Sequence, residues 1–204
     1  MTTGLYAAGI GAGAVGSSGA ADPFAGWIWP VPIHPDGRRP KISQGYDAAP
    51  DVSGRFSARH AGVDIMYPRR PEEPIGLPYG TRGHFMPDGI PALAAGPGKV
   101  YSSKMSSLGW SVVIDHGQWA TFYQHMRGPL VQKGQLVVAG TPLAEVHHSP
   151  AGYGLKHLHF ELWHGASTRH VDPAPFMLGG HGGTPWRMVG FKVKEGGGFS
   201  VGGF

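Results

Sequence analysis

Two histidines stand one residue apart in the apolar stretch KHLHFELW, residues 156–163. Successive side chains of a β-strand point to opposite faces, so His157 and His159 would share one face with Glu161, and the apolar residues between them would share the other. The apolar face suits a protein core. We expect a metal ion or a substrate to meet both imidazoles if partners from elsewhere in the chain join them.

A second group of polar residues lies in RHAGVDI, residues 59–65, where His60 and Asp64 are four residues apart with Gly62 between them. Taken alone, this spacing is a weak signal that chance often supplies. Together with the His-x-His pair it offers nitrogen and oxygen ligands for a catalytic zinc ion, which uses three protein ligands and leaves a fourth position for water. A closed structural zinc site is the competing interpretation, and the absence of cysteine together with the surplus of histidines argues against it.

Five motifs together resemble a known family: HAGVD, VVIDHG, FYQH, VQKGQ and HLHFEL occur in the order and approximate spacing of the lysostaphin-like zinc metalloendopeptidases with a LytM-type domain. The resemblance spans Ile42 to Pro173, and the combination is specific although each motif alone is not. Members of that family cut peptide cross-links of bacterial peptidoglycan. The resemblance therefore implies a zinc-dependent endopeptidase with a small antiparallel β-sheet domain and a groove walled by loops.

The same resemblance assigns roles to individual residues. It implies that His60, Asp64 and His159 hold one zinc ion, and that His125 and His157 form a metal-free catalytic pair. Of this pair, one histidine would act as general base and the other would stabilise the tetrahedral oxygen. The motifs do not say which histidine does which.

The other titratable residues near these motifs receive a plainer interpretation. Glu161 either orients a ligand histidine as a hydrogen-bond acceptor or is a solvated or salt-bridged glutamate. We interpret the remaining histidines as structural or exposed: His34, His84, His116, His147, His148, His164, His170 and His181.

Short runs of β-forming residues recur between Lys41 and Met177, and no long helical periodicity competes with them. Residues 110–116 and 119–125 are separated by a Gly-Gln dipeptide, which favours a type II′ hairpin. Strand alternation would place His125 on the same face as Thr121 and Tyr123. The sequence thus predicts a mainly β, antiparallel domain.

The length of 204 residues fits one domain with a substantial core. Glycine is concentrated near both ends, so we predict a flexible arm at 1–26, the metallopeptidase domain at 27–178 and a glycine-rich tail at 179–204. Two Pro- and Gly-rich loops, 67–89 and 149–156, depart from the family pattern and would border the groove, so the resemblance does not establish the substrate preference. The sequence leaves open a glycine bridge or a D-alanyl bond to diaminopimelate as the cross-link.

The net charge of +4 favours an anionic partner, for which nucleic acid, a membrane surface and the bacterial cell wall all qualify. There is no dense basic cluster beyond Arg69 and Arg70 and no nucleic-acid motif, so we predict no nucleic-acid role. The apolar stretch at 5–16 is too short to span a bilayer, and no Lys or Arg precedes Arg38 as in a signal peptide. We predict no membrane span and no clear signal peptide.

Three functions compete on this basis. The first is a zinc endopeptidase acting on peptidoglycan, a phage- or bacterium-encoded antimicrobial lysin. The second is a catalytically silent cell-wall-binding relative, and the third is a structural component of a virion. The complete set of ligands and catalytic histidines favours the enzyme, which we expect to act as a monomer on the cell wall, outside the cell, on a phage particle or after release at lysis.

Overall fold

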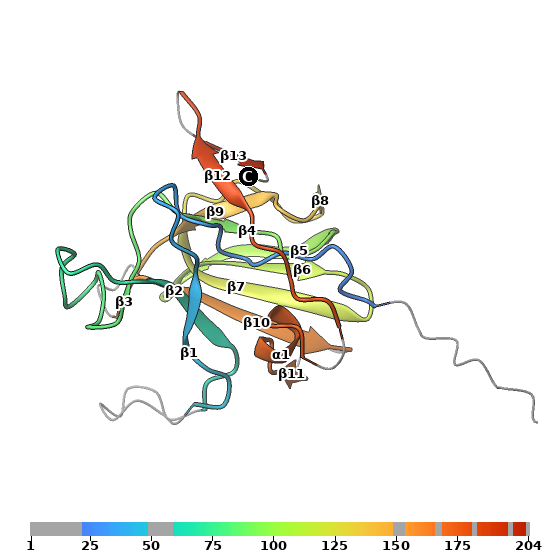
Figure 1. Ribbon diagram of the computed structural model, residues 1–204. Helices are drawn as coiled ribbons and strands as arrows, with labels where there is room; N and C mark the ends of the chain where they lie inside the picture. The colour runs from blue at the N-terminus through green and yellow to red at the C-terminus, as the bar shows by residue number, and fades with distance from the viewer. Residues whose placement is uncertain are drawn as a thin grey trace, which may run out of the picture.

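The computed structural model describes residues 22–48, 59–148, 154–165, 169–180, 183–195 and 198–202 (Figure 1). Most of the predicted arm and residues 149–153 of the second predicted loop lie outside these ranges. The elements of the described chain are β1 (Lys41–Gln44), β2 (Val63–Pro68), β3 (His84–Phe85), β4 (Pro91–Leu93), β5 (Gly98–Ser106), β6 (Gly109–Asp115), β7 (Trp119–Arg127), β8 (Leu136–Val137), β9 (Pro142–Val146), β10 (Leu158–His164), β11 (His170–Val171), α1 (Ala174–Met177), β12 (Gly190–Val193) and β13 (Phe199–Gly202).

The predicted mainly β, antiparallel fold class is confirmed. The large sheet has the strand order β1-β2-β10-β7-β6-β5-β8, and every strand pairing in it is antiparallel. At one end of β7 the sheet continues into β9, which also pairs with β4. Figure 1 shows β4 and β9 on one side of the central strands, with the β12–β13 hairpin beyond them. Strands β10 and β2 are therefore neighbours although almost a hundred residues separate them.

The hairpin between β6 and β7 forms where the Gly-Gln dipeptide predicted it. The backbone N–H of His116 donates to the carbonyl of Trp119 at 2.9 Å, which leaves two residues in the turn. Gly117 has a φ of 94°, a conformation that glycine adopts without steric cost. The hairpin fixes the register of β7, the strand that carries His125.

Strand alternation separates the two faces of β10 as predicted. Leu158, Phe160 and Leu162 are fully buried and belong to the hydrophobic core. The ring of Phe160 contacts the ring of Tyr123 on the neighbouring strand at a centroid distance of 5.3 Å. The opposite face carries His159 and the other polar residues of the candidate site, so the core fixes the backbone from which the site projects.

The alternation predicted for β7 is wrong at its far end. Thr121 and Tyr123 point into the core, and regular pleating would send His125 the same way. Instead His125 has a φ of 64°, in the left-handed region that residues other than glycine rarely adopt. The ladder between β6 and β7 also shifts register nearby, between Trp110 and Val112. This local irregularity turns the imidazole of His125 onto the face of His159.

Residues on both sides of the predicted domain boundaries pack into one core. Phe24, which precedes position 27, is buried against Trp27 and Trp186, and Trp186 follows position 178. Isolated parallel bridges join Ile28 to Arg187 and Ile33 to Gly190. The boundaries stay predictions, but the described part of the tail region lies against the segment that opens the domain.

The loop at 67–89 has its own regular structure. Strand β3 pairs with the end of β2 and so closes the loop at its base. The guanidinium of Arg38 donates to the carboxylate of Glu73 at 2.8 Å, which ties the loop to the entry segment. The described part of the chain contains no helix with the length and apolarity needed to cross a bilayer.

Candidate metal centre and active site

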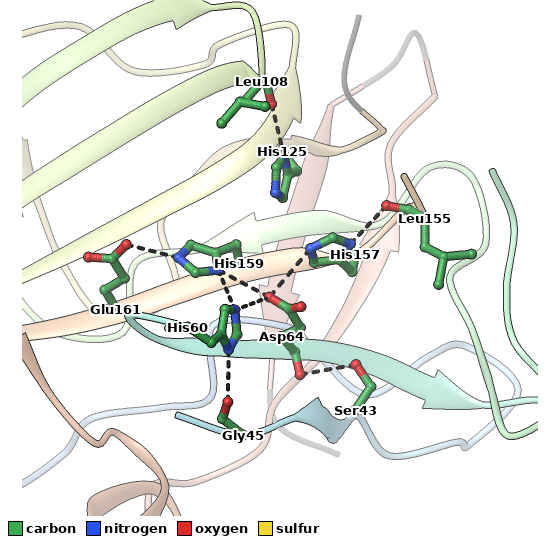
Figure 2. A network of polar contacts seen from close by, with 10 residues as sticks. All are labelled: Ser43, Gly45, His60, Asp64, Leu108, His125, Leu155, His157, His159 and Glu161. Carbon is green, nitrogen blue, oxygen red and sulfur yellow. Dashed lines mark hydrogen bonds and ion pairs between the residues drawn. The ribbon is translucent and has the colours of Figure 1, made fainter. Parts of the chain in front are cut away.

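Three of the predicted site residues converge on one point (Figure 2). Nε2 of His60, Oδ1 of Asp64 and Nδ1 of His159 lie 3.0, 3.0 and 3.1 Å from one another. They form the only such group of potential ligand atoms among the residues that the structure describes. Ligands at about 2.0–2.2 Å in a tetrahedron around zinc lie roughly 3.3–3.6 Å apart, so these three atoms are a few tenths of an ångström closer together than one face of that tetrahedron.

Sheet register explains why Asp64 meets His159. The two residues lie directly opposite each other on β2 and β10, and residues opposite each other in an antiparallel pair project to the same face. Both side chains are largely buried, each residue being 9% exposed. His60 precedes β2 and reaches the same point from the loop that enters the strand.

Gly62 allows that loop to approach β10. A Cβ atom at this position would lie 2.3 Å from the carbonyl oxygen of Phe160, far inside van der Waals contact. Only glycine therefore permits the backbone between His60 and Asp64 to run this close to the neighbouring strand. The glycine of the HAGVD motif is needed for packing, and through packing it sets the positions of both ligands.

Both histidines of this group have a fixed tautomer. Nδ1 of His60 donates to the carbonyl of Gly45 at 2.8 Å, which leaves Nε2 with a free lone pair. Nε2 of His159 donates to Oε1 of Glu161 at 2.9 Å, which leaves Nδ1 free. The hydrogen bond considered for Glu161 is thus present, and each histidine turns its lone pair to the shared point.

The carboxylate of Glu161 has further partners that hold it in place. Its Oε2 accepts a hydrogen bond from Nε1 of Trp163 at 2.6 Å and lies 2.9 Å from Nδ1 of His170. The indole of Trp163 in turn stacks on Phe122 at a centroid distance of 5.7 Å. Glu161 therefore connects His159 to an aromatic pair on the same face of the sheet.

The electrostatics of the group are those of a carboxylate among imidazoles. Burial alone would raise the pKa of Asp64, but His157, His159 and His60 hold it well below its ordinary value. Burial alone would lower the pKa of His159, but hydrogen bonds with Asp64 and Glu161 raise it to about 9. A metal cation and a proton would therefore compete for the lone pair of Nδ1 in His159.

The two predicted catalytic histidines lie beside this group and not within it. The rings of His125 and His157 are 4.6 Å apart between centroids, and the ring of His125 is 6.1 Å from that of His159. Nδ1 of His125 donates to the carbonyl of Leu108 at 2.9 Å, and Nδ1 of His157 donates to the carbonyl of Leu155 at 2.8 Å. In both rings Nδ1 is therefore used within the fold and Nε2 is the other nitrogen, which in His157 faces Asp64 (Figure 2).

The surroundings of the two rings differ. Burial and the nearby charge of His157 lower the pKa of His125 to about 3, so this imidazole is neutral at ordinary pH. Nε2 of His157 lies 3.4 Å from Oδ1 of Asp64. Among the described residues, Nε2 of His125 has no hydrogen-bond partner, and its lone pair is free to accept a hydrogen bond.

Most of the groups that orient these histidines carry no signal in the sequence. Three of them are the backbone carbonyls of Gly45, Leu108 and Leu155, and every residue type carries such a carbonyl. Glu161 was found because strand alternation places it beside His159. The role of His170 as a partner of Glu161 was missed, because it depends on the pairing of β11 with β10.

A comparison with protein families matches residues 82–173 to Peptidase family M23, which confirms the resemblance stated from the motifs. The match includes His125, His157 and His159. His60 and Asp64 precede it, and the fold brings them to the matched segment. A search of the curated proteins gave no match.

Several solved structures are similar to the chain. A zinc-containing peptidase from Vibrio cholerae is 28% identical over 72% of this chain, with a TM-score of 0.51, and this chain spans only 39% of its length. A structure of the SpoIIQ–SpoIIIAH pore-forming complex is 16% identical over 74% of this chain and 89% of the other, with a TM-score of 0.52, and shows the fold alone. The catalytic domain of lysostaphin from Staphylococcus simulans is 20% identical over 70% of this chain and 94% of the other, with a TM-score of 0.49.

Proposed function

On the premise that residues 82–173 belong to peptidase family M23, we propose that the protein is a zinc-dependent endopeptidase that hydrolyses peptide cross-links of bacterial peptidoglycan. The observation that carries this proposal is the convergence of three ligand atoms within 3.1 Å, beside two further imidazoles whose rings lie 4.6 Å apart. The place of action that we propose with it is the bacterial cell wall.

His60, Asp64 and His159 would hold the zinc ion. Two nitrogens and one carboxylate oxygen suit zinc, and the donor set has no thiolate that would close the site. When bound, zinc activates a water molecule and polarises the scissile carbonyl. The carbonyl of Gly45 and the carboxylate of Glu161 keep the two ligand histidines in the tautomers that this binding needs.

His125 and His157 would divide the proton transfers of amide hydrolysis between them. The neutral ring of His125 offers a lone pair at Nε2 that can accept a hydrogen bond from the reacting groups. His157 presents Nε2 from the opposite side, close to Asp64. A departing amine needs a proton and a developing oxyanion needs a donor, and imidazoles held 4.6 Å apart can serve both needs at one scissile bond.

The test is a zymogram on purified cell walls of several chemotypes, run with and without a chelator. We expect clearing that the chelator abolishes and that added zinc restores. Mass analysis of the released fragments then identifies the bond, either within a glycine bridge or between D-alanine and diaminopimelate. His164→Ala, which changes an exposed histidine at the end of β10, is the matched control and should clear as the wild type does.

The silent cell-wall-binding module remains the alternative that this experiment separates. Clearing that persists in the presence of the chelator would contradict the proposed dependence on zinc. Absence of clearing on all wall types from protein that carries bound zinc would contradict the peptidase and favour the silent module.

A further inference from the structure

The two histidines of the His-x-His pair are held in different ways. His159 lies within the sheet and is paired with Asp64 on one side and with Gln124 on the other. His157 precedes β10, and neither neighbouring strand pairs with it. Its side chain is oriented by a hydrogen bond to the carbonyl of Leu155 and by a 3.4 Å contact of Nε2 with Oδ1 of Asp64, and neither contact holds its backbone. The backbone that carries His157 therefore needs another anchor.

Lys156 supplies three contacts at this point. Its backbone N–H donates to the carbonyl of Pro78 at 2.6 Å. Its ammonium group donates to the carboxylate of Asp88 and lies 5.4 Å from the centre of the Tyr79 ring. The hydrogen bond from Lys156 also lowers the pKa of Asp88. All three partners belong to the loop at 67–89.

The burial of Lys156 is unusual for a lysine. Its side chain is 2% exposed, whereas lysine side chains are rarely buried unless a partner compensates the charge. Adjacent side chains of an extended chain point in opposite directions, so Lys156 turns into the loop while His157 turns to the candidate site. The anchor and the histidine thus use opposite sides of the same short backbone segment.

The loop that receives Lys156 is itself fixed to the strand of a metal ligand. β3 closes the loop onto the end of β2, and β2 also carries Asp64. Within the loop, Arg69 donates to the carbonyl of Glu73 at 2.6 Å, and the ring of Tyr79 stacks on Phe85. A contact from Lys156 to this loop therefore holds its backbone at a set position relative to Asp64.

We propose that Lys156 is a positioning residue for His157. By docking the backbone segment before β10 onto the 67–89 loop, Lys156 holds the His157 ring in its position beside His125 and Asp64. The expected effect on catalysis rests on the proposed function, whereas the effect on the position of His157 does not. Lys156 does not touch the ligand group. Its loss should misplace His157 while His60, Asp64 and His159 keep their arrangement, because the sheet and not the loop contact holds His159.

The test compares Lys156→Met, which keeps the length of the side chain and removes its charge, with the conservative variant Lys156→Arg. In Lys156→Met we expect the NMR signals of the His157 ring to shift or broaden while those of His159 stay in place. We expect kcat on wall fragments to fall by about 10–100-fold, the size of effect that a misplacement of about 1 Å can cause. Lys156→Arg should restore part of both losses.

Zinc affinity separates positioning from general damage. It should change by less than about tenfold in Lys156→Met, below the range typical for loss of a group that orients a metal ligand. Lys104→Met on the exposed side of β5 is the matched control and should resemble the wild type in every measurement. A wild-type His157 signal in Lys156→Met, or a loss of zinc affinity as large as the loss of kcat, would overturn the proposal.

Asp88→Asn provides a second test if Lys156→Met does not fold. The side chain of Asp88 is 70% exposed, so the fold should tolerate the change. The His157 signal should move in the same direction but less, because the bond from the Lys156 backbone to Pro78 remains. An unchanged His157 signal would then overturn the proposal. If the wild type cleaves no wall, the proposed peptidase fails, while the NMR and zinc measurements still decide the role of Lys156.

Discussion

Two histidines of the β6–β7 hairpin, His116 and His125, share most of their local chemistry and differ in the bonding of one ring nitrogen, Nε2. Each donates Nδ1–H to a backbone carbonyl, of Pro97 and Leu108 respectively, and burial lowers the pKa of each. Nε2 of His116 is bonded to the hydroxyl of Thr121 at 2.8 Å, whereas Nε2 of His125 has no partner among the described residues. A neutral imidazole with both nitrogens satisfied is structural, and one with a free lone pair is available for chemistry.

The bonds of His116 continue into the core. The hydroxyls of Thr121 and Tyr123 are 3.0 Å apart, and the phenol oxygen of Tyr123 accepts the N–H of Ala95 at 2.9 Å. This chain satisfies buried polar groups that would otherwise be costly. At the other end of β7 the left-handed backbone of His125 turns its ring out of the core. The same strand therefore carries a structural end and a functional end.

The largest effect should come from the ligand group at the functional end. His159→Ala should lose both zinc and activity, because it removes one of three ligands and the partner of Glu161. His157→Ala should retain zinc while kcat falls by about 10²–10⁴-fold, the usual range for a group that transfers protons. Zinc content of the purified variants and hydrolysis of cell walls measure the two outcomes. Equal zinc loss in both variants would contradict the assignment.

Replacing each of these two histidines by alanine tests the comparison between them directly. His125→Ala should lower kcat by about 10²–10⁴-fold and cost less stability than His116→Ala, because only Nδ1 of His125 is bonded within the fold. His116→Ala should leave kcat nearly unchanged and cost about 1–3 kcal/mol of unfolding free energy, because it leaves the partners of both nitrogens unsatisfied. Chemical denaturation and wall hydrolysis on the same preparations give both quantities. An equal loss of kcat in both variants would contradict the assignment of His116 as structural and His125 as functional.

Gly62 allows a test of how far packing sets the ligand group. Gly62→Ala should cost about 1–3 kcal/mol, as insertion of a methyl group into a close-packed site usually does, because its Cβ would collide with the carbonyl of Phe160. It should also weaken zinc binding, since His60 and Asp64 flank the position. Gly202→Ala on β13, where an added Cβ meets nothing within 4 Å, is the matched control. Equal zinc affinity in the two variants would show that the backbone can adjust.

The smallest effect should be a pH dependence of stability from His116. Because burial lowers its pKa in the folded state, the unfolded chain takes up a proton first as the pH falls below about 6.5, and the folded state loses stability. One such group contributes at most about 1.4 kcal/mol per pH unit. Denaturation of zinc-free wild type and His116→Gln at pH 5 and pH 8 isolates this contribution as a difference. A wild type that is no more sensitive to acid than the variant would argue against a neutral His116.

Local sequence patterns predicted the features that depend on residues close together in the chain, such as the faces of a strand and a tight turn. Alternation along residues 156–163 predicted His157, His159 and Glu161 on one face, because the pleat repeats every two residues along a strand. The Gly-Gln turn likewise predicted the β6–β7 hairpin. Alternation was wrong at His125, because a register shift against β6 and a left-handed residue interrupt the pleat there. Nothing in the sequence of β7 alone marks that interruption.

By itself the sequence determined the kinds of ligand atom, the mainly β fold and the polar face of the His-x-His strand, since these follow from residue type and short spacing. Only the tertiary structure decided that Asp64 lies opposite His159, that carbonyls of Gly45, Leu108 and Leu155 orient three of the rings, and that Lys156 docks the strand entry on a distant loop. The reason is that these contacts join residues far apart along the chain, through backbone groups that every residue shares.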